Sequence, residues 1–200
     1  MQKAIKYLTN KNKIFALIIE QYGIPVIPVR PQGFETLALL ILEQQVSIDS
    51  AKATFLKLKK TAESFTPIIL LALTDEEYRT CGVSRQKTSY IKALASAVIN
   101  KTIDIDSLPF KTPEIIRDEL IKIKGIGHWT IDVYLMFCLQ STDIMPLGDI
   151  AIVNTIKELF NIHDRKEMEI FSQAWSPHRS VATFLLWHYY LGKRNRKVYY

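Results

Sequence analysis

Apolar residues recur at helical spacing along almost the whole chain of 200 residues, and only seven glycines interrupt them. A period near 3.6 residues places such side chains on one face of a helix, whereas a half-buried strand needs an alternating pattern. Ile24 to Val29 has the composition of a short strand, but pieces of this kind are too few to build a sheet. The pattern therefore predicts an all-α fold, and it contains no repeat of fixed period and no long linker.

Capping residues, glycines and prolines divide this pattern into about nine or ten helices. The opening helix runs from about Lys3 to Gln21 and ends at Gly23, before a Pro-rich extended link over Pro25 to Pro31. Thr74 and Glu77 have the spacing of a capping box. The other predicted helices are Phe34 to Val46, Ser47 (as cap) to Thr61, Ser84 to Asn100, Thr112-Pro113 to Ile123, His128 to Leu139, Asp149 to Phe160, one beginning at Asp164 with Glu167, and Ser176-Pro177 to Gly192.

Composition excludes several classes of protein. No run of about 18 apolar residues is present, so a membrane span is not expected. The two cysteines, Cys81 and Cys138, lie in apolar helical patterns, so we expect their side chains to be buried as free thiols. This use of cysteine is typical of a protein in a reducing compartment. Two thiols are too few to ligate an iron–sulfur cluster. The net charge of +6 suits a polyanionic partner, although solubility alone explains it equally well.

The stretch from Ile121 to Thr130, Ile-Lys-Ile-Lys-Gly-Ile-Gly-His-Trp-Thr, joins two helical segments through a turn. Glycine allows a sharp turn and a close approach of another molecule to the backbone. The turn leads into a helix N-terminus, whose N–H groups suit a phosphate. Ile126, between Gly125 and Gly127, would anchor the turn in the core. The alternative is an ordinary corner between two helices with no ligand.

A second feature is Asp149, which follows Pro146-Leu147-Gly148 and stands where a helix N-cap belongs. Backbone N–H groups and the positive end of the helix dipole stabilise an ionised carboxylate at this place. Such a fixed negative charge suits a reaction that develops positive charge on a sugar. Taken alone, however, an N-cap aspartate can equally well serve only as a cap.

The hairpin, the apolar helix and this aspartate together resemble the helix–hairpin–helix/Gly-Pro-Asp superfamily of DNA glycosylases. Gly33 to Ser47, Gly82 to Lys87 and Trp175 to Ser180 are similar to motifs of its 3-methyladenine DNA glycosylase II branch. The similarity extends from about Lys3 to Leu191. It implies one domain over residues 1–200, a two-lobed helical bundle with an active-site cleft between the lobes, without the extra N-terminal domain of larger members. Leu147 and Lys124 depart from the family pattern.

The resemblance implies a hydrolase for base excision repair. It would flip alkylated purines such as 3-methyladenine or 7-methylguanine out of duplex DNA and cut the N-glycosidic bond. Asp149 would be the catalytic residue, either stabilising the sugar cation or also orienting water. Bifunctional branches carry a lysine nucleophile two residues after the second hairpin glycine, where this chain has Trp129. A monofunctional enzyme without lyase activity is therefore expected.

The resemblance also implies roles for further residues. Gln45 would fill the space left by the flipped base, and Gln44 would contact the opposite strand or brace the loop. Carbonyls of Ile121, Ile123 and Ile126 would hold a structural Na⁺ or K⁺, and no other cofactor is expected. The expected base pocket consists of Trp129, Val133, Tyr134, His178 and Trp187, and the other expected DNA contacts are Ser47, Lys124, Gly125, Ile126, Gly127, His128 and Thr130.

Two rival interpretations stay open. One is a catalytically silent helix–hairpin–helix module that binds DNA without turnover. The other is a glycosylase of the same superfamily with another base specificity, which the missing cysteine cluster and missing lysine disfavour. In the preferred interpretation the partner is damaged double-stranded DNA, the protein is a monomer, and no membrane is involved. The expected compartment is the cytoplasm, associated with the nucleoid, in a prokaryote and the nucleus in a eukaryote, and the protein is not secreted.

Overall fold

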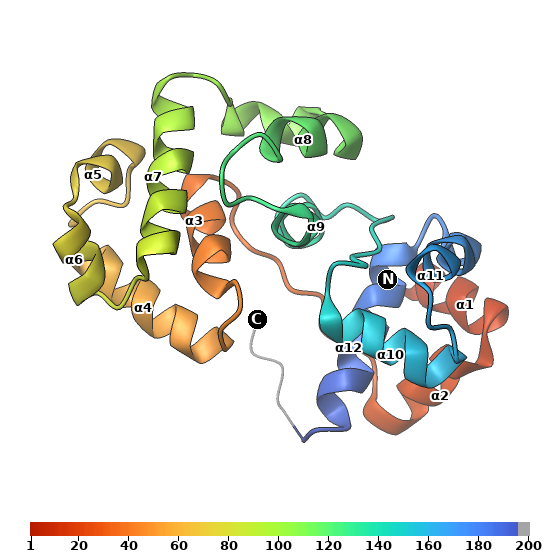
Figure 1. Cartoon of the computed structure of the whole chain (residues 1–200). Coiled ribbons are helices and arrows are strands. Elements are labelled where there is room, and N and C mark those ends of the chain that lie inside the picture. The colour runs from red at the N-terminus through yellow and green to blue at the C-terminus, as the bar shows by residue number, and fades with distance from the viewer. Residues whose placement is uncertain (196–200) are drawn as a thin grey trace. The chain divides into compact units, whose positions relative to one another are not determined.

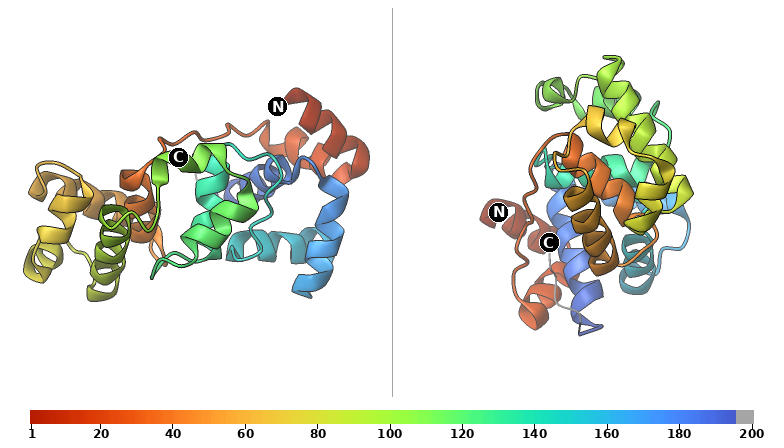
Figure 2. Two further views of the ribbon diagram at one scale, coloured as in Figure 1. Left: turned by 90° about the horizontal axis from the view of Figure 1, so that it is seen from above. Right: turned by 90° about the vertical axis from the view of Figure 1, so that its left-hand side faces the viewer.

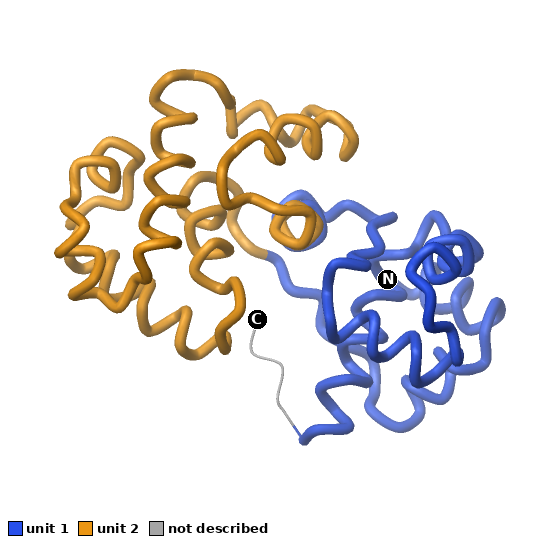
Figure 3. Tube along the Cα trace, viewed as in Figure 1, with its two compact units in different colours: residues 1–29, 135–200 blue, residues 30–134 orange. Residues whose placement is uncertain are grey.

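The computed structural model describes residues 1–195, which form helices, turns and loops without a β-strand (Figure 1). The prediction of an all-α fold is therefore confirmed for this part of the chain. The chain divides into two compact units (Figure 3): unit 1 contains residues 1–29 and the chain from residue 135 onward, and unit 2 contains residues 30–134. No described helix is long and apolar enough to cross a membrane.

Unit 1 is built around its last helix, α12, which packs against α2 and α10. Every residue of α12 from Ser180 to Trp187 is buried, as expected for a helix surrounded by others. Unit 1 contains two clusters of aromatic rings. One consists of Phe15, Phe160, Phe171 and Trp175, and the other consists of Phe137, Phe184 and Trp187. The helices of unit 1 are α1 (Gln2–Lys11), α2 (Lys13–Tyr22), α10 (Ile150–Phe160), α11 (Arg165–Ser172), the short 3₁₀ helix η2 (Gln173–Trp175) and α12 (Arg179–Gly192).

The first helix differs from its prediction, because the single helix expected over Lys3 to Gln21 is broken at Asn12. That residue has an extended backbone, and its side chain accepts a hydrogen bond from Ile14 N at 2.9 Å. Asparagine is a strong N-cap residue, so it begins a new helix within the apolar pattern. The extended link predicted after Gly23 is present, and Ile24 to Val29 forms no strand.

Unit 2 is organised around its longest helix, α7, which contacts α3, α5 and α6. The different views show α7 between α3 and the α5–α6 pair (Figures 1 and 2). Thr74 and Glu77 form the predicted capping box at the start of α6. The helices are α3 (Phe34–Glu43), α4 (Ile48–Thr61), α5 (Pro67–Ala72), α6 (Asp75–Thr80), α7 (Arg85–Ile99), the 3₁₀ helix η1 (Ile105–Phe110) and α8 (Pro113–Leu120).

The next helix, α9 (His128–Phe137), begins in unit 2, and the division between the units falls within it, after Tyr134. The helix predicted to reach Ile123 ends three residues earlier, at Leu120, because the chain turns there into the hairpin. Residues 121–127 thus connect α8 to α9 without helical structure.

Candidate DNA-binding and catalytic site

The hairpin of unit 2 is a tight turn with its apolar residue inward. Ile126 is buried, as predicted, and its N–H donates to Ile123 O at 3.0 Å. Gly125 has a backbone φ of +91°, a conformation that side-chain-bearing residues rarely adopt. Lys122 and Lys124, by contrast, are exposed. The turn is therefore anchored on one side and presents cations and backbone on the other.

The two hairpin glycines are needed for different reasons. A Cβ atom on Gly125 would collide with the Tyr90 side chain, which comes from α7. A Cβ atom on Gly127 would meet nothing within 4 Å, and its φ is not in the positive range. The fold therefore explains Gly125 but not Gly127, which is exposed and free of packing constraints.

Gly127 also marks the start of α9, because its carbonyl accepts the first helical hydrogen bond, from Ile131 N, at 3.1 Å. The first N–H groups of a helix have no acceptor within it and favour an anion. His128 is exposed beside them. Thr130, expected as a DNA contact, is instead buried, and its hydroxyl accepts a hydrogen bond from Gln44 at 3.0 Å. Its side chain therefore occupies a packing position.

An ion pair joins the two helices that flank the hairpin. Arg117 in α8 lies 2.5 Å from Oδ1 of the buried Asp132 in α9. Burial raises the pKa of Asp132 above its ordinary value, and the positive charges of Arg117 and then His128 partly oppose this rise. Sequence reasoning missed this pair. A carboxylate at the fifth position of an otherwise apolar helix was the only available signal.

The loop between α3 and α4 carries the expected wedge residue, Gln45. This side chain is exposed, and its backbone has a positive φ of 57°. Ser47 accepts a hydrogen bond from Ser50 N at 3.2 Å and caps α4, as predicted. The Gln44 amide is turned inward, where its nitrogen donates to Gly125 O at 2.8 Å as well as to Thr130. The structure thus favours the bracing role for Gln44 over a contact with the opposite strand.

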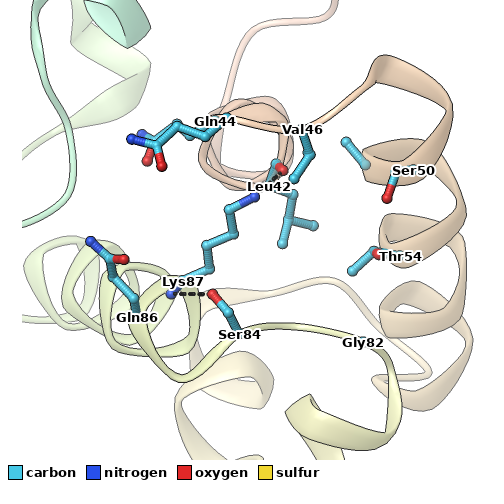
Figure 4. A pocket seen from close by; sticks show the side chains of 11 residues that line it. Leu42, Gln44, Val46, Ser50, Thr54, Gly82, Ser84, Gln86 and Lys87 are labelled. Atoms are coloured by element: carbon cyan, nitrogen blue, oxygen red, sulfur yellow. Dashed lines mark hydrogen bonds between the residues drawn. The ribbon is translucent and has the colours of Figure 1, made fainter.

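A pocket of about 260 Å³ lies beside this loop (Figure 4). Its walls come from the end of α3, the first turns of α4 and the start of α7, and its lining is polar and apolar in nearly equal parts. Lys87 crosses it to donate to Leu42 O at 2.7 Å, and burial lowers the pKa of this lysine. The lining includes Gln45, Ser50, Thr54, Ser84 and Gln86.

In unit 1, Asp149 is the N-cap of α10, as predicted. Its Oδ1 accepts a hydrogen bond from Ile152 N at 3.0 Å and a second from the indole nitrogen of Trp187, which comes from α12, at 3.2 Å. The side chain is half-buried, and the neighbouring Ile150 is largely exposed. Two donors from different helices therefore fix one carboxylate oxygen near the protein surface.

The aromatic residues expected around the base occupy different environments. Trp187 is buried and packs its ring against Phe137 and Phe184. Its indole N–H donates the hydrogen bond to Asp149. His178 is half-buried with its ring edge-on to Tyr7.

Within unit 2, Trp129 is half-buried at the start of α9. Tyr134 is fully buried, and its hydroxyl accepts a hydrogen bond from Gly33 N at 3.1 Å. Val133 is also buried, so it and Tyr134 occupy packing positions in this structure.

The hairpin carbonyls expected to hold a monovalent cation are main-chain oxygens, which are the ligand type that such ions take. The Ile123 carbonyl already accepts the Ile126 N–H, which uses one of its two lone pairs. In residues 1–195 no group of three or more His, Cys, Asp or Glu side chains is arranged to hold a metal ion.

Comparison with known proteins identifies the family. A family model described as HhH-GPD superfamily base excision DNA repair protein matches residues 39–179, which is more than half of the chain. The chain belongs to this superfamily. An alkylbase DNA glycosidase-like protein of Schizosaccharomyces pombe is 27% identical over 98% of this chain and 96% of its own length. DNA-3-methyladenine glycosylase 1 of the same organism is 29% identical over 79% of this chain and 72% of its own.

Solved structures give the same result. A DNA-3-methyladenine glycosidase from Bacillus halodurans superposes with a TM-score of 0.82 at 28% identity, covering 96% of this chain and 91% of that one. A 3-methyladenine DNA glycosylase of Schizosaccharomyces pombe in complex with abasic DNA gives a TM-score of 0.81 at 26% identity, with 92% and 95% covered. The predicted family is therefore confirmed together with the fold.

Proposed function

We propose that this protein is a monofunctional DNA glycosylase that hydrolyses the N-glycosidic bond of alkylated purines, such as 3-methyladenine and 7-methylguanine, in duplex DNA. The observation that carries the proposal is the carboxylate of Asp149, fixed at the start of α10 by Ile152 N–H and Trp187 N–H. The similarity to proteins named as 3-methyladenine glycosylases supports the choice of substrate.

The reaction breaks the bond between C1′ of the deoxyribose and the base nitrogen, and the electron pair leaves with the base. Alkylation has already made the base cationic, so it departs neutral without a proton from the enzyme. The sugar becomes an oxocarbenium-like cation, which the negative charge of Asp149 stabilises. Water then attacks C1′ and gives up a proton, and an abasic site results. Electrostatic stabilisation of this kind is often the largest single contribution to catalysis.

Unit 2 supplies the DNA grip. Backbone N–H groups at Gly127 and the start of α9 would bind a phosphate, which is a contact that does not depend on sequence. Lys124 and His128 lie exposed next to them and add positive charge or hydrogen-bond donors. Gln45 would enter the stack when the base leaves it, at an unstacking cost of a few kcal/mol.

Trp129 has two parts in this proposal. Its half-buried indole would offer a π face to the cationic base, an attraction of about 0.5–2 kcal/mol. It also stands at the position of the lysine nucleophile in bifunctional relatives, and an indole cannot form a Schiff base. A structural Na⁺ or K⁺ on the carbonyls of Ile121, Ile123 and Ile126 would stiffen the hairpin, without a part in the chemistry.

The test is to incubate the protein with methylated duplex DNA and to quantify the free bases by chromatography, with DNA binding measured in parallel. We expect 3-methyladenine and 7-methylguanine to be released and the strand to stay intact. A protein that binds the same DNA but releases no base would be the silent binding module instead. Release of adenine opposite a mismatch, or of oxidised guanine, in preference to methylated bases would assign the other specificity.

A further inference from the structure

Three successive residues at the end of α3, Leu42, Glu43 and Gln44, each form a hydrogen bond or ion pair with another segment of unit 2. Helix C-termini leave the last four carbonyl groups without partners within the helix, and side-chain donors can satisfy them. Here the ammonium group of Lys87, from α7, donates to Leu42 O at 2.7 Å. Figure 4 shows this side chain reaching across the pocket toward Leu42. Lys87 is partly buried, and the hydrogen bond to Leu42 O offsets part of the solvation that its ammonium group loses.

The next residue, Glu43, is held in a second way. Its carboxylate forms a two-pronged ion pair with the guanidinium of Arg30, at 2.8 and 3.0 Å. Only 14% and 10% of the two side chains is exposed. A planar, two-bonded pair of this kind fixes orientation as well as distance, and water screens it little. Arg30 comes from the extended link before α3, so this second anchor is independent of Lys87.

The third residue, Gln44, is tied to the hairpin. Its amide nitrogen donates to Gly125 O and to the hydroxyl of Thr130, at 2.8 and 3.0 Å. Both hydrogens of the amide are thus used within the protein. Gln45, immediately afterwards, is exposed and has a left-handed backbone. A strained residue at the surface persists only where its surroundings hold it.

We propose that Lys87, Arg30 and Gln44 are positioning residues that hold Gln45 ready for insertion and join it to the phosphate-binding hairpin as one rigid body. The inference rests on the proposed function, in which Gln45 replaces the extruded base. In this arrangement, gripping a phosphate at the hairpin also sets the position of the wedge. The loop does not have to be ordered when DNA arrives, which lowers the cost of binding.

The test compares two substrates in single-turnover base release: a methylated base in a paired duplex, and the same base in an unpaired bubble. Extrusion is least costly for a base that is already unpaired. Lys87→Met keeps the length of the side chain and removes the donor. Lys92→Met is the matched control, because Lys92 lies on the same helix and pairs with Asp75 at the surface. Gln44→Met tests the tie to the hairpin, and Gln45→Ala removes the wedge itself.

Lys87→Met, Gln44→Met and Gln45→Ala should each slow release from the paired duplex by about 10- to 100-fold. On the bubble they should stay within about threefold of the wild type, as Lys92→Met should on both substrates. Equal slowing on both substrates, or no slowing, by Lys87→Met and Gln44→Met would overturn the positioning role. If Gln45→Ala alone keeps full activity, the wedge assignment fails. If the wild type releases no base from either substrate, the proposed function itself fails.

Discussion

Tyr90 packs directly against Gly125, so that a Cβ atom on this glycine would overlap the aromatic side chain. The contact joins α7 to the hairpin and explains why the turn needs a glycine at this position. Gly127, two residues later, has open space where a Cβ atom would stand. Packing therefore requires the first glycine of the pair, whereas no packing contact of the described residues requires the second.

This difference gives the first prediction. Gly125→Ala should lower the free energy of unfolding by about 2–4 kcal/mol. The substitution would combine the strain of a positive φ with the overlap between the new Cβ atom and Tyr90. Gly127→Ala should cost less than about 1 kcal/mol of stability and weaken binding to every DNA sequence about equally. Urea denaturation and fluorescence anisotropy with several duplexes measure the two effects. Sequence-selective weakening by Gly127→Ala would argue against a phosphate contact.

The burial of Asp132, which the positive charge of Arg117 only partly offsets, should make stability depend on pH. The pKa of Asp132 is raised in the folded protein, so the folded state holds the proton more tightly and stability falls as pH rises through that raised pKa. Arg117→Met removes the counter-charge and raises the pKa further. It should destabilise the protein by about 1–3 kcal/mol near pH 8, with a smaller loss near pH 5.

Urea denaturation at both pH values tests this account, with Arg79→Met as control. Arg79 makes an exposed ion pair with Glu76, whose removal should have little effect at either pH. If the loss caused by Arg117→Met were equal at the two pH values, the buried charge of Asp132 would not be its cause.

The hydrogen bond from Trp187 to Asp149 leads to a third prediction. Trp187→Phe keeps much of the packing against Phe137 and Phe184 but removes the N–H donor. Hydrogen bonds to charged groups contribute about 1.5–3 kcal/mol, so base release should slow about 10-fold or more. Trp175→Phe is the control, since Trp175 lies in the other aromatic cluster of unit 1. Comparable slowing by both substitutions would mean that the effect is general loosening.

The absence of a lysine at position 129 predicts the outcome of a trapping experiment. Borohydride reduces a Schiff base between a protein amine and the sugar to a stable adduct. We expect no such adduct with methylated DNA, and the abasic product should stay uncut until alkali is added. A covalent protein–DNA complex would show that a lysine elsewhere in the chain acts as the nucleophile.

The sequence predicted elements whose signals are local. The capping box of Thr74 and Glu77, the Ser47 cap and the Asp149 cap depend on neighbouring residues, and all are present. The break at Asn12 was missed because apolar spacing continues across it, although asparagine is itself a cap signal. Helix propensity alone does not choose between a continuous helix and a capped break.

The contacts that shape the site were beyond sequence reasoning because they join distant segments. Nothing local shows that Gln44 turns toward Gly125, 81 residues later, rather than toward solvent. Likewise, Thr130 follows an exposed turn, and only tertiary packing buries it. The motif named the candidate residues, whereas the structure divides them into those that hold the loop and those that stay exposed.

The central claim is that the carboxylate of Asp149 drives the chemistry, and one comparison tests it most directly. Asp149→Asn keeps an N-cap side chain but removes the charge. Asp164→Asn makes the same change at the N-cap of α11 in the same unit. In single-turnover release of 3-methyladenine from duplex DNA, we expect Asp149→Asn to be slower by about 100-fold or more, with DNA binding retained, and Asp164→Asn to match the wild type. Equal rates for Asp149→Asn and the wild type would contradict the account.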